Sequence, residues 1–197
     1  MKKSLLLLTV ILLSALGLEA QSAPPQLPGF GVSAYVGYTG VTNQGLGSGV
    51  LTSFAAPIYT NPGFASGPLK NDAMTVSGRI DNVFTTSPGG NVLTGGPEFR
   101  FQFSSATFLD GKVFQPFVNV GVGAARSSCV ATSACPVGTD TTTHFAYKFG
   151  VGIDTISSTH VIWRLLEYDR VQSKFFPGNG VTLSNANQFI TSIGFRF

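Results

Sequence analysis

The last seven residues, TSIGFRF (Thr191–Phe197), alternate between apolar and polar side chains and end on a phenylalanine. Ile193, Phe195 and Phe197 share one face of an extended chain, and the residues between them share the other. Chain termini usually fray into water, where a phenylalanine gains nothing. The stretch therefore predicts a terminal β-strand whose apolar face meets either a protein core or a lipid bilayer.

The opposite end of the chain has the layout of a secretory signal peptide. Two lysines precede an apolar run from Leu5 to Leu18, and small residues follow that run. The run is shorter than the ~20 residues that a membrane-spanning helix needs, which disfavours an N-terminal anchor. We therefore expect residues 1–20 to be removed after Ala20 and the mature chain to leave the cytoplasm.

The composition is unusually poor in charge. Only 11% of the chain is Asp, Glu, Lys or Arg, whereas typical soluble proteins have ~25%. The chain also contains 24 glycines and 17 phenylalanines. Its formal net charge of +3 is too small an imbalance to indicate nucleic-acid binding. Few charges, many aromatic residues and many turn-forming residues favour an all-β protein with little water-facing surface.

Alternation with a period of two recurs along the chain. Its clearest example is THFAYKFGVGID, residues 143–154. Eight such segments can be counted, and turn-rich stretches such as TTSPGGN, residues 85–91, separate them. The segments centre near residues 35, 53, 79, 101, 120, 149, 166 and 193. The pattern predicts one all-β domain over residues 30–197, an eight-stranded antiparallel up-and-down barrel, after a short periplasmic segment at 21–29.

Alternation alone does not say which face of the barrel meets water. A secreted lipocalin-like ligand-binding barrel would place its apolar face inside, whereas a transmembrane barrel places it against lipid. Soluble surfaces are typically ~25–35% charged, but the polar face of each strand here carries only one or two charges and many glycines. Such a face suits a narrow interior, so we favour the transmembrane β-barrel.

Two parts of the sequence resemble small outer-membrane β-barrel proteins. The ending QFITSIGFRF is similar to their C-terminal assembly signal, carried here by Ile193, Gly194, Phe195 and Phe197. Segments from FQPFVNVGVG to the end of HVIWRLLEYDRV resemble the second half of the OmpA-like transmembrane domain and of opacity-type eight-stranded barrels. The resemblance covers most of residues 90–197. Unlike full-length OmpA-type proteins, the chain has no domain after Phe197, so peptidoglycan binding is not implied.

The resemblance implies a location and a set of partners. It implies a monomer in the outer membrane, in contact with membrane lipid and lipopolysaccharide, that the barrel-assembly machinery recognises during biogenesis. It also implies either a structural role or a role of the surface loops in adhesion or in binding an extracellular partner. The alternatives within the membrane interpretation are a narrow pore and a lipid-modifying outer-membrane enzyme.

The connections between strands follow from this orientation. With both termini in the periplasm, inner connections should be short and outer ones longer. The stretch near 60–72 is an exception, which indicates either an insertion there or a misplaced second strand. Cys129 and Cys135, the only cysteines, fall in the longest outer loop, and in an exported protein we expect them to form a disulfide.

The charges on the predicted inner face balance in sign. An eight-stranded barrel is only just wide enough for its own side chains to fill, and buried charges need partners. We therefore expect a salt-bridged plug without transport, with Glu98, Arg100 and Lys148 in one group and Arg164, Glu167 and Arg196 in another. The ten residues are Arg79, Arg100, Lys148, Arg164, Arg196, Asp81, Glu98, Asp154, Glu167 and Asp169.

Alternation fails at one place in the plug. Arg164 and Glu167 are three residues apart and cannot both face inward in a regular strand, so we predict a β-bulge near Leu165–Leu166. The bulge would place Arg164, Glu167 and Asp169 inside the barrel. It would place Trp163 and Tyr168 towards lipid, with Trp163 near the periplasmic aromatic girdle.

No catalytic, metal or cofactor site is predicted. His160 would lie at the periplasmic end, and His144, within TTTHFAYK, does not match the signature of lipid A deacylases. We expect His144 to be a hydrogen-bonded residue of the lumen or rim. The cysteine and histidine spacing suggests no metal site, and glycine clusters such as GVGIDT lack the strand-to-helix context of a nucleotide loop.

Overall fold

The computed structural model of the protein describes eight stretches of the chain: residues 31–42, 48–62, 73–86, 89–102, 113–128, 141–157, 160–173 and 184–197. Each of these stretches contains one β-strand. The strands are β1 (Ser33–Thr42), β2 (Gly49–Pro62), β3 (Ala73–Thr86), β4 (Gly89–Gln102), β5 (Val113–Ser128), β6 (Thr141–Ile156), β7 (Val161–Ser173) and β8 (Ser184–Arg196). No helix in these stretches is long and apolar enough to cross a membrane.

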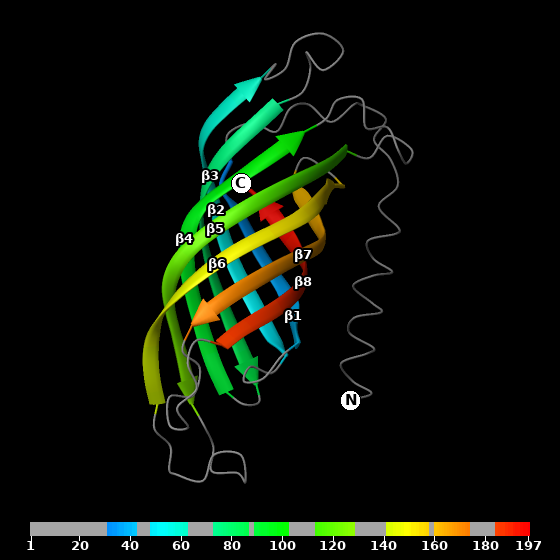
Figure 1. The fold of residues 1–197 in the computed structure, drawn as a ribbon. Coiled ribbons are helices and arrows are strands. Elements are labelled where there is room, and N and C mark those ends of the chain that lie inside the picture. Colours follow the sequence, from blue (N-terminus) through cyan, green and yellow to red (C-terminus); the bar gives the residue numbers. More distant parts are fainter. Residues whose placement is uncertain are drawn as a thin grey trace, which may run out of the picture.

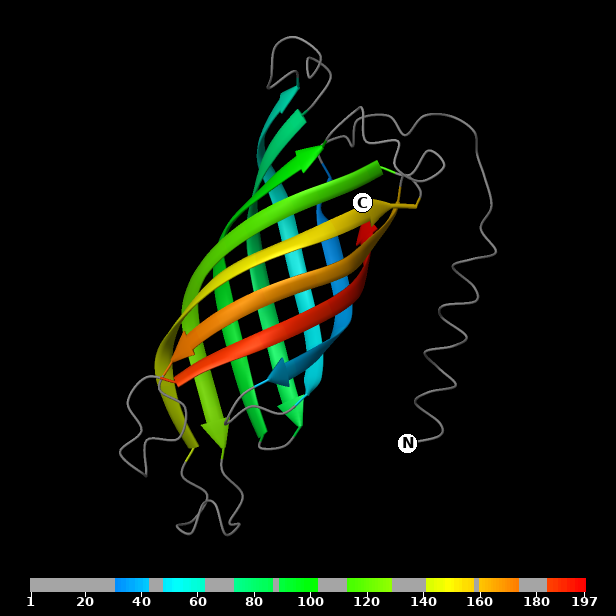
Figure 2. The same cartoon turned by 45° about the vertical axis from the view of Figure 1, so that its right-hand side comes forward.

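The strands close into a single barrel in which every neighbour is antiparallel (Figures 1 and 2). Each strand pairs with the next along the chain, and the ring is completed by β1 and β8, whose register runs from Ser33 opposite Arg196 to Thr42 opposite Asn187. The predicted eight-stranded up-and-down barrel is therefore confirmed. All eight predicted segments fall on strands.

The barrel has two ends, which we name from the chain. The C-terminal end holds the start of β1, the end of β8 and the connections 63–72, 103–112 and 157–160. The distal end holds the other four connections. Figure 2 shows β2 and β3 extending past their neighbours at the C-terminal end, and β5 and β6, of 16 residues each, extending at the distal end.

The connection lengths do not sort by end as predicted. The stretch TTSPGGN is mostly strand, because β3 runs to Thr86 and β4 begins at Gly89, so a short hairpin lies at the distal end. Thr85 and Gly90 are paired across this hairpin. At the C-terminal end, β2 continues to Pro62 through a register shift between Pro57 and Tyr59, and the connection that follows it remains long.

Some sequence predictions lie outside the described residues. They are the signal peptide, the segment at 21–29 and the disulfide between Cys129 and Cys135. These three remain predictions.

Alternation along each strand sends apolar side chains outward and polar ones inward. Many large apolar residues on the outer face are 39–80% exposed, among them Phe54, Ile80, Val122 and Phe145. The inner face carries the buried charged and amide side chains. This is the reverse of a water-soluble protein, in which charged residues are mostly exposed.

The interior is layered along the barrel axis. Nearest the distal end, a buried apolar cluster is built from small and branched residues of seven strands: Leu51, Val83, Val92, Ala125, Ala146, Val171, Ala186 and Ile190. Nearer the C-terminal end, a second cluster joins Tyr35, Ala55 and Ile162. The charged residues lie on the C-terminal side of the first cluster and are in contact with the second, through Tyr35.

Candidate functional site: a charged plug inside the barrel

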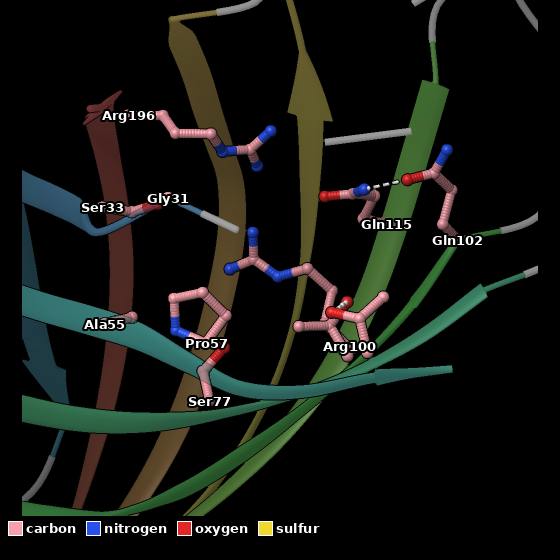
Figure 3. Close-up of a pocket in the computed structure, with 11 residues that line it drawn as sticks. Gly31, Ser33, Ala55, Pro57, Ser77, Arg100, Gln102, Gln115 and Arg196 are labelled. Atoms are coloured by element: carbon pink, nitrogen blue, oxygen red, sulfur yellow. Dashed lines mark hydrogen bonds between the residues drawn. The ribbon is translucent and has the colours of Figure 1, made fainter. Parts of the chain in front are cut away.

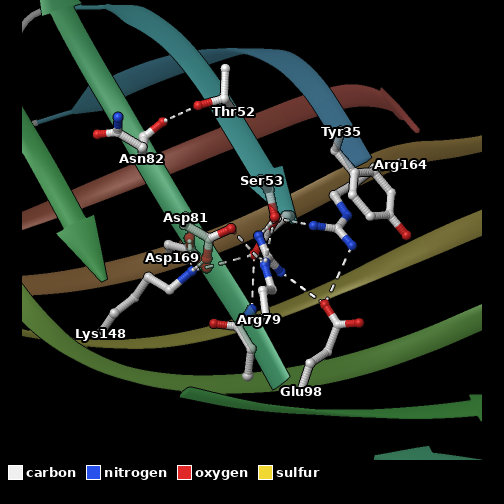
Figure 4. Close-up of polar contacts among 12 residues, drawn as sticks. Tyr35, Thr52, Ser53, Arg79, Asp81, Asn82, Glu98, Lys148, Arg164 and Asp169 are labelled. Carbon is white, nitrogen blue, oxygen red and sulfur yellow. Dashed lines mark hydrogen bonds and ion pairs between the residues drawn. The ribbon is translucent and has the colours of Figure 1, made fainter. Parts of the chain in front are cut away.

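Nine buried charged side chains meet inside the barrel, and we call them the plug. Each is at most 8% exposed, and four strands supply them because alternation points them all inward. The plug consists of Arg79 and Asp81 on β3, Glu98 and Arg100 on β4, Lys148 and Asp154 on β6, and Arg164, Glu167 and Asp169 on β7. Figure 4 shows how side chains from different strands converge on its centre.

Arg79 and Glu167 form the centre of the plug. The Arg79 guanidinium lies 2.7 Å from Asp81, 3.0 Å from Glu98 and 2.8 Å from Glu167. Its Nε also donates to the Ser53 hydroxyl at 3.2 Å. Arg79 therefore bridges β2, β3, β4 and β7, strands that are not all neighbours in the ring.

Arg164 and Arg100 share the carboxylates on the side towards the C-terminal end. Arg164 binds Asp154 through two nitrogens, at 2.9 and 3.1 Å, and lies 2.9 Å from Glu167. Nη2 of Arg100 lies 2.8 Å from Glu98 and 3.0 Å from Asp154. Arginine suits this position because its planar fork can hold several carboxylates at once.

Lys148 holds the other side of the plug. Its Nζ pairs with Asp81 and with Asp169, the latter at 3.0 Å. It does not pair with Glu98, which is the partner that the sequence suggested. Oδ1 of Asp169 and Oδ1 of Asn119 have no hydrogen-bond partner among the described residues. Both oxygens lie near Gly150, since a Cβ there would be 1.9 Å from the first and 2.9 Å from the second.

Two aromatic residues that the sequence did not single out belong to this site. The Phe117 ring centre lies 4.2 Å from the Arg164 guanidinium carbon and within 6 Å of those of Arg79 and Arg100. Tyr35 lies 4.4 Å from Arg164 and accepts a hydrogen bond from Arg100 at 3.0 Å. A cation over an aromatic face is favourable, and more so away from water.

A signal for both aromatic residues was present in the sequence. Phe117 has the same strand parity as Gln115 and Asn119, and Tyr35 has that of Ser33. Parity therefore puts both aromatic residues on the polar face, where aromatic residues are rarely expected. Asn119 was also missed, and its amide donates to Glu167 at 2.8 Å.

The β-bulge predicted in β7 is confirmed. Asp154 and Ile153 of β6 pair with Arg164 and Leu166, which leaves Leu165 as the extra residue. Pairing with β8 shifts at the same place. Leu165 and Leu166 both face outward, so Arg164 and Glu167 both face inward.

Three further residues lie away from the plug. Arg196, predicted as part of the network, makes no ion pair within the described residues and lies at the C-terminal end, where it lines a cavity. His144 faces inward near the distal end, and its Nε2 has no hydrogen-bond partner in the described stretches, contrary to expectation. His160 precedes β7, and its carbonyl accepts the Arg196 amide at 2.8 Å.

The arrangement joins side chains of non-neighbouring strands across the interior of the barrel. Each of the nine charged groups makes at least one ion pair, aromatic rings lie against the guanidinium groups, and the apolar cluster lies towards the distal end. Within the part of the chain that the structure describes, no group of three or more His, Cys, Asp or Glu could hold a metal ion.

Comparison with known proteins gives similarities among solved structures only. No family model matches the chain, and no curated protein matches it by sequence. Neisserial surface protein A is 14% identical, with 85% of this chain and 96% of that chain covered and a TM-score of 0.46.

Two further solved structures are similar. The attachment invasion locus protein Ail of Yersinia pestis is 13% identical, with 85% and 99% covered and a TM-score of 0.40. The outer membrane enzyme PagL is 16% identical, with 85% and 98% covered and a TM-score of 0.40. Identities and TM-scores this low carry no property of these proteins to this chain.

Proposed function

We propose that the protein is an integral outer-membrane β-barrel with a closed interior. It acts by its presence in the membrane or through the connections between its strands, and it neither conducts solutes nor catalyses a reaction. Its exported chain, its C-terminal signal and its barrel architecture all suit this location.

The observation that carries the proposal is the inverted polarity of the barrel. The outer face exposes aromatic and branched residues on all sides of the ring, from Val36 on β1 to Phe195 on β8, whereas nine charged groups are buried. The largest apolar patch on a typical soluble monomer is about 300–600 Å². A continuous apolar belt around a barrel needs lipid, because exposing it to water would drive association.

The closed interior is supported by two layers in series. In the plug, guanidinium, ammonium and carboxylate groups form ion pairs with one another. These paired side chains would stand in the way of an ion moving along the barrel axis. The apolar cluster around Leu51, Val92 and Ile190 lies on the distal side of the plug. Apolar constrictions exclude water and ions, so either layer would block conduction.

The other candidate functions have less support. A lipocalin-like ligand binder would need the opposite polarity. A lipid-modifying enzyme would need a reactive pair facing the membrane, whereas His144 faces the interior. The pore is opposed by the two closed layers.

The membrane location is tested by gel migration and extraction. A folded barrel extracted from the membrane in detergent should migrate differently in unheated and heated samples and should partition into the outer-membrane fraction. Recovery of a folded protein in the detergent-free soluble fraction would contradict the proposal.

The closed interior is tested in planar bilayers. Purified protein should give no reproducible single-channel steps under an applied voltage. A matched control is the double variant Leu51→Ser with Arg164→Ala, which opens both layers and should give measurable current if insertion has occurred. Stable steps from the unaltered protein would overturn the closed-interior proposal.

A further inference from the structure

A cavity lies at the C-terminal end of the barrel. The plug separates it from the apolar cluster around Leu51 at the distal end. Its volume is about 40 Å³, and the first residues of β1, the last of β8 and the ends of β2 to β5 line it. A water needs about 10–15 Å³ by the same measure. The cavity therefore has room for a few waters or for one small polyatomic ion.

The charged groups that line this cavity are all positive. Arg100 and Arg196 are among the lining residues, and no Asp or Glu is. In Figure 3 their two guanidinium groups face each other across the open space. Like charges brought together are unfavourable without an anion or water between them.

Neither arginine is saturated by the protein. The contacts of Arg100 with Glu98, Asp154 and Tyr35 all use its Nη2, and its buried Nε has no hydrogen-bond partner among the described residues. Arg196 makes no ion pair in the same residues. Two forked donors therefore remain available on opposite sides of one cavity.

The remaining lining groups suit an oxyanion that keeps a proton. Hydroxyls of Ser33 and Ser77 line the cavity and can donate to oxygen. Gln115 is 1% exposed and donates its amide to Gln102 at 2.7 Å, which leaves its Oε1 as an acceptor without a partner. Sulfate has no proton to offer such an acceptor at neutral pH, whereas hydrogen phosphate has one.

The charge of the plug does not oppose an anion at this place. The plug holds five carboxylates and four basic groups. The carboxylate with a free oxygen is Asp169, which contacts Lys148 and lies at the other end of the chain of ion pairs from Arg100. The positive charge of Arg196 offsets the extra carboxylate of the plug only at a distance. Arg196 makes no ion pair with the plug, so no plug carboxylate occupies its N–H donors.

The geometry points to a binding site for a small phosphate oxyanion at the C-terminal mouth of the barrel, held by Arg100 and Arg196, with Gln115 accepting its proton. The oxyanion is either free hydrogen phosphate or the phosphomonoester of a lipid headgroup, since a phosphodiester has no proton at neutral pH. The site belongs to the barrel mouth and does not depend on the closed interior or on the membrane location.

The test uses the mature chain refolded in octyl glucoside micelles, which contain no phosphate. Inorganic phosphate is titrated by calorimetry at neutral pH and low salt, and sulfate is titrated in parallel. We expect saturable phosphate binding and weaker sulfate binding. A separate series adds phosphatidic acid to the micelles, because its phosphomonoester can carry a proton at neutral pH. Loss of phosphate binding there identifies a lipid headgroup as the ligand, and unchanged binding identifies free phosphate.

The decisive variant is Arg196→Gln, because Arg196 makes no ion pair that the fold would lose. Removing one charged hydrogen-bonding partner should weaken phosphate binding by about tenfold to a hundredfold. The matched control is Arg170→Gln, which removes the same charge from the exposed outer face of β7 and should bind as the parent does. Heat-dependent gel migration verifies that both variants are folded.

Three results would overturn the site. The first is that the parent protein binds no phosphate up to about 10 mM, the range of weak sites. The second is that Arg196→Gln binds phosphate as tightly as the parent does. The third is that Arg170→Gln weakens phosphate binding as much as Arg196→Gln does. Sulfate binding as tight as phosphate binding would overturn the part assigned to Gln115.

Discussion

At the scale of single residues, the plug contains one carboxylate more than it has basic groups. Asp169 is the member with an unpartnered oxygen, and the neighbouring Asn119 oxygen also lacks a donor among the described residues. The Asn119 amide cannot be turned over to relieve this, because its nitrogen donates to Glu167. Two acceptors beside Gly150 therefore face a shortage of donors.

We expect Asp169→Asn to be tolerated, because the new amide supplies a donor for Asn119 and removes the excess charge. Its free energy of unfolding should fall by no more than about 1 kcal/mol, the net value of one hydrogen bond. The matched variant Glu167→Gln leaves Arg79 and Arg164 without their shared charge and should lose about 3–5 kcal/mol. Urea unfolding followed by the fluorescence of Trp163, the only tryptophan, measures both. Equal losses would contradict this account of the imbalance.

Glycines on the inner face make room for the plug. A Cβ on Gly194 would lie 2.4 Å from the Tyr35 ring, and a Cβ on Gly152 would lie 2.4 Å from the Phe117 ring. Gly194 belongs to the predicted C-terminal assembly signal, so its small size also has a structural reason in the folded barrel.

We expect Gly194→Ala to lower the free energy of unfolding by about 1–3 kcal/mol, the usual cost of overpacking. The same change should cost less in a Tyr35→Ala background, because the ring that it would meet is gone. A double-mutant cycle from four urea titrations measures this coupling. A cost of Gly194→Ala that is the same in both backgrounds would show that the Tyr35 ring is not the cause.

At the scale of the strand, the bulge in β7 is what allows two plug residues to share a face. Leu165 has no paired residue in β6 or in β8. The residues before and after it therefore keep their partners whether or not Leu165 is present. Deleting Leu165 would leave Arg164 and Glu167 two positions apart, both facing inward in a regular strand.

We therefore expect the chain without Leu165 to fold, with a melting temperature close to that of the parent. Deleting Tyr168 from the same strand should prevent folding, because it would turn one side of β7 over and place charged residues against lipid. Heat-dependent gel migration after refolding distinguishes the two chains. Failure of the Leu165 deletion to fold while the Tyr168 deletion folds would contradict the observed register.

Sequence patterns predicted the strands and this bulge because both depend on local alternation. They made the TTSPGGN turn too long, since a Gly-Gly pair is typical of turns even where pairing with Thr85 and Thr86 holds it in a strand. They also missed Phe117 and Tyr35 as members of the site. Parity shows which face a residue occupies, but which partner it meets depends on how the strands stagger around the ring.

The same limit applies to the charges. Nine of ten predicted inward residues are buried together, because a charge on a barrel strand has few other places to go. The pairing of Lys148 with Asp81 and the separate position of Arg196 follow from register, which no local pattern contains.

At the scale of the whole molecule, the polarity of the barrel predicts how it responds to a charge on its outer face. Val120 is 43% exposed in the middle of β5 and faces outward. In water, Val120→Arg would change stability by about 0.5 kcal/mol at most. In a bilayer it should cost about 2–4 kcal/mol near the midplane.

The measurement is urea unfolding from lipid vesicles, with Val120→Leu as the matched control for a change of side chain without charge. We expect Val120→Leu to unfold like the parent and Val120→Arg to unfold at clearly lower urea. Indistinguishable midpoints for the two variants would indicate that the belt does not lie in hydrocarbon.

The pairing between β1 and β8 determines when the barrel can close. Because β8 completes the ring and is the last of the eight strands in the chain, the barrel cannot close before β8 has been synthesised. Until that moment β1 has an edge of unpaired amides and carbonyls, which invites pairing with other chains. Formation of such long-range contacts is intrinsically slow. A chain interrupted before β8 would keep this open edge on β1, because no other strand pairs there.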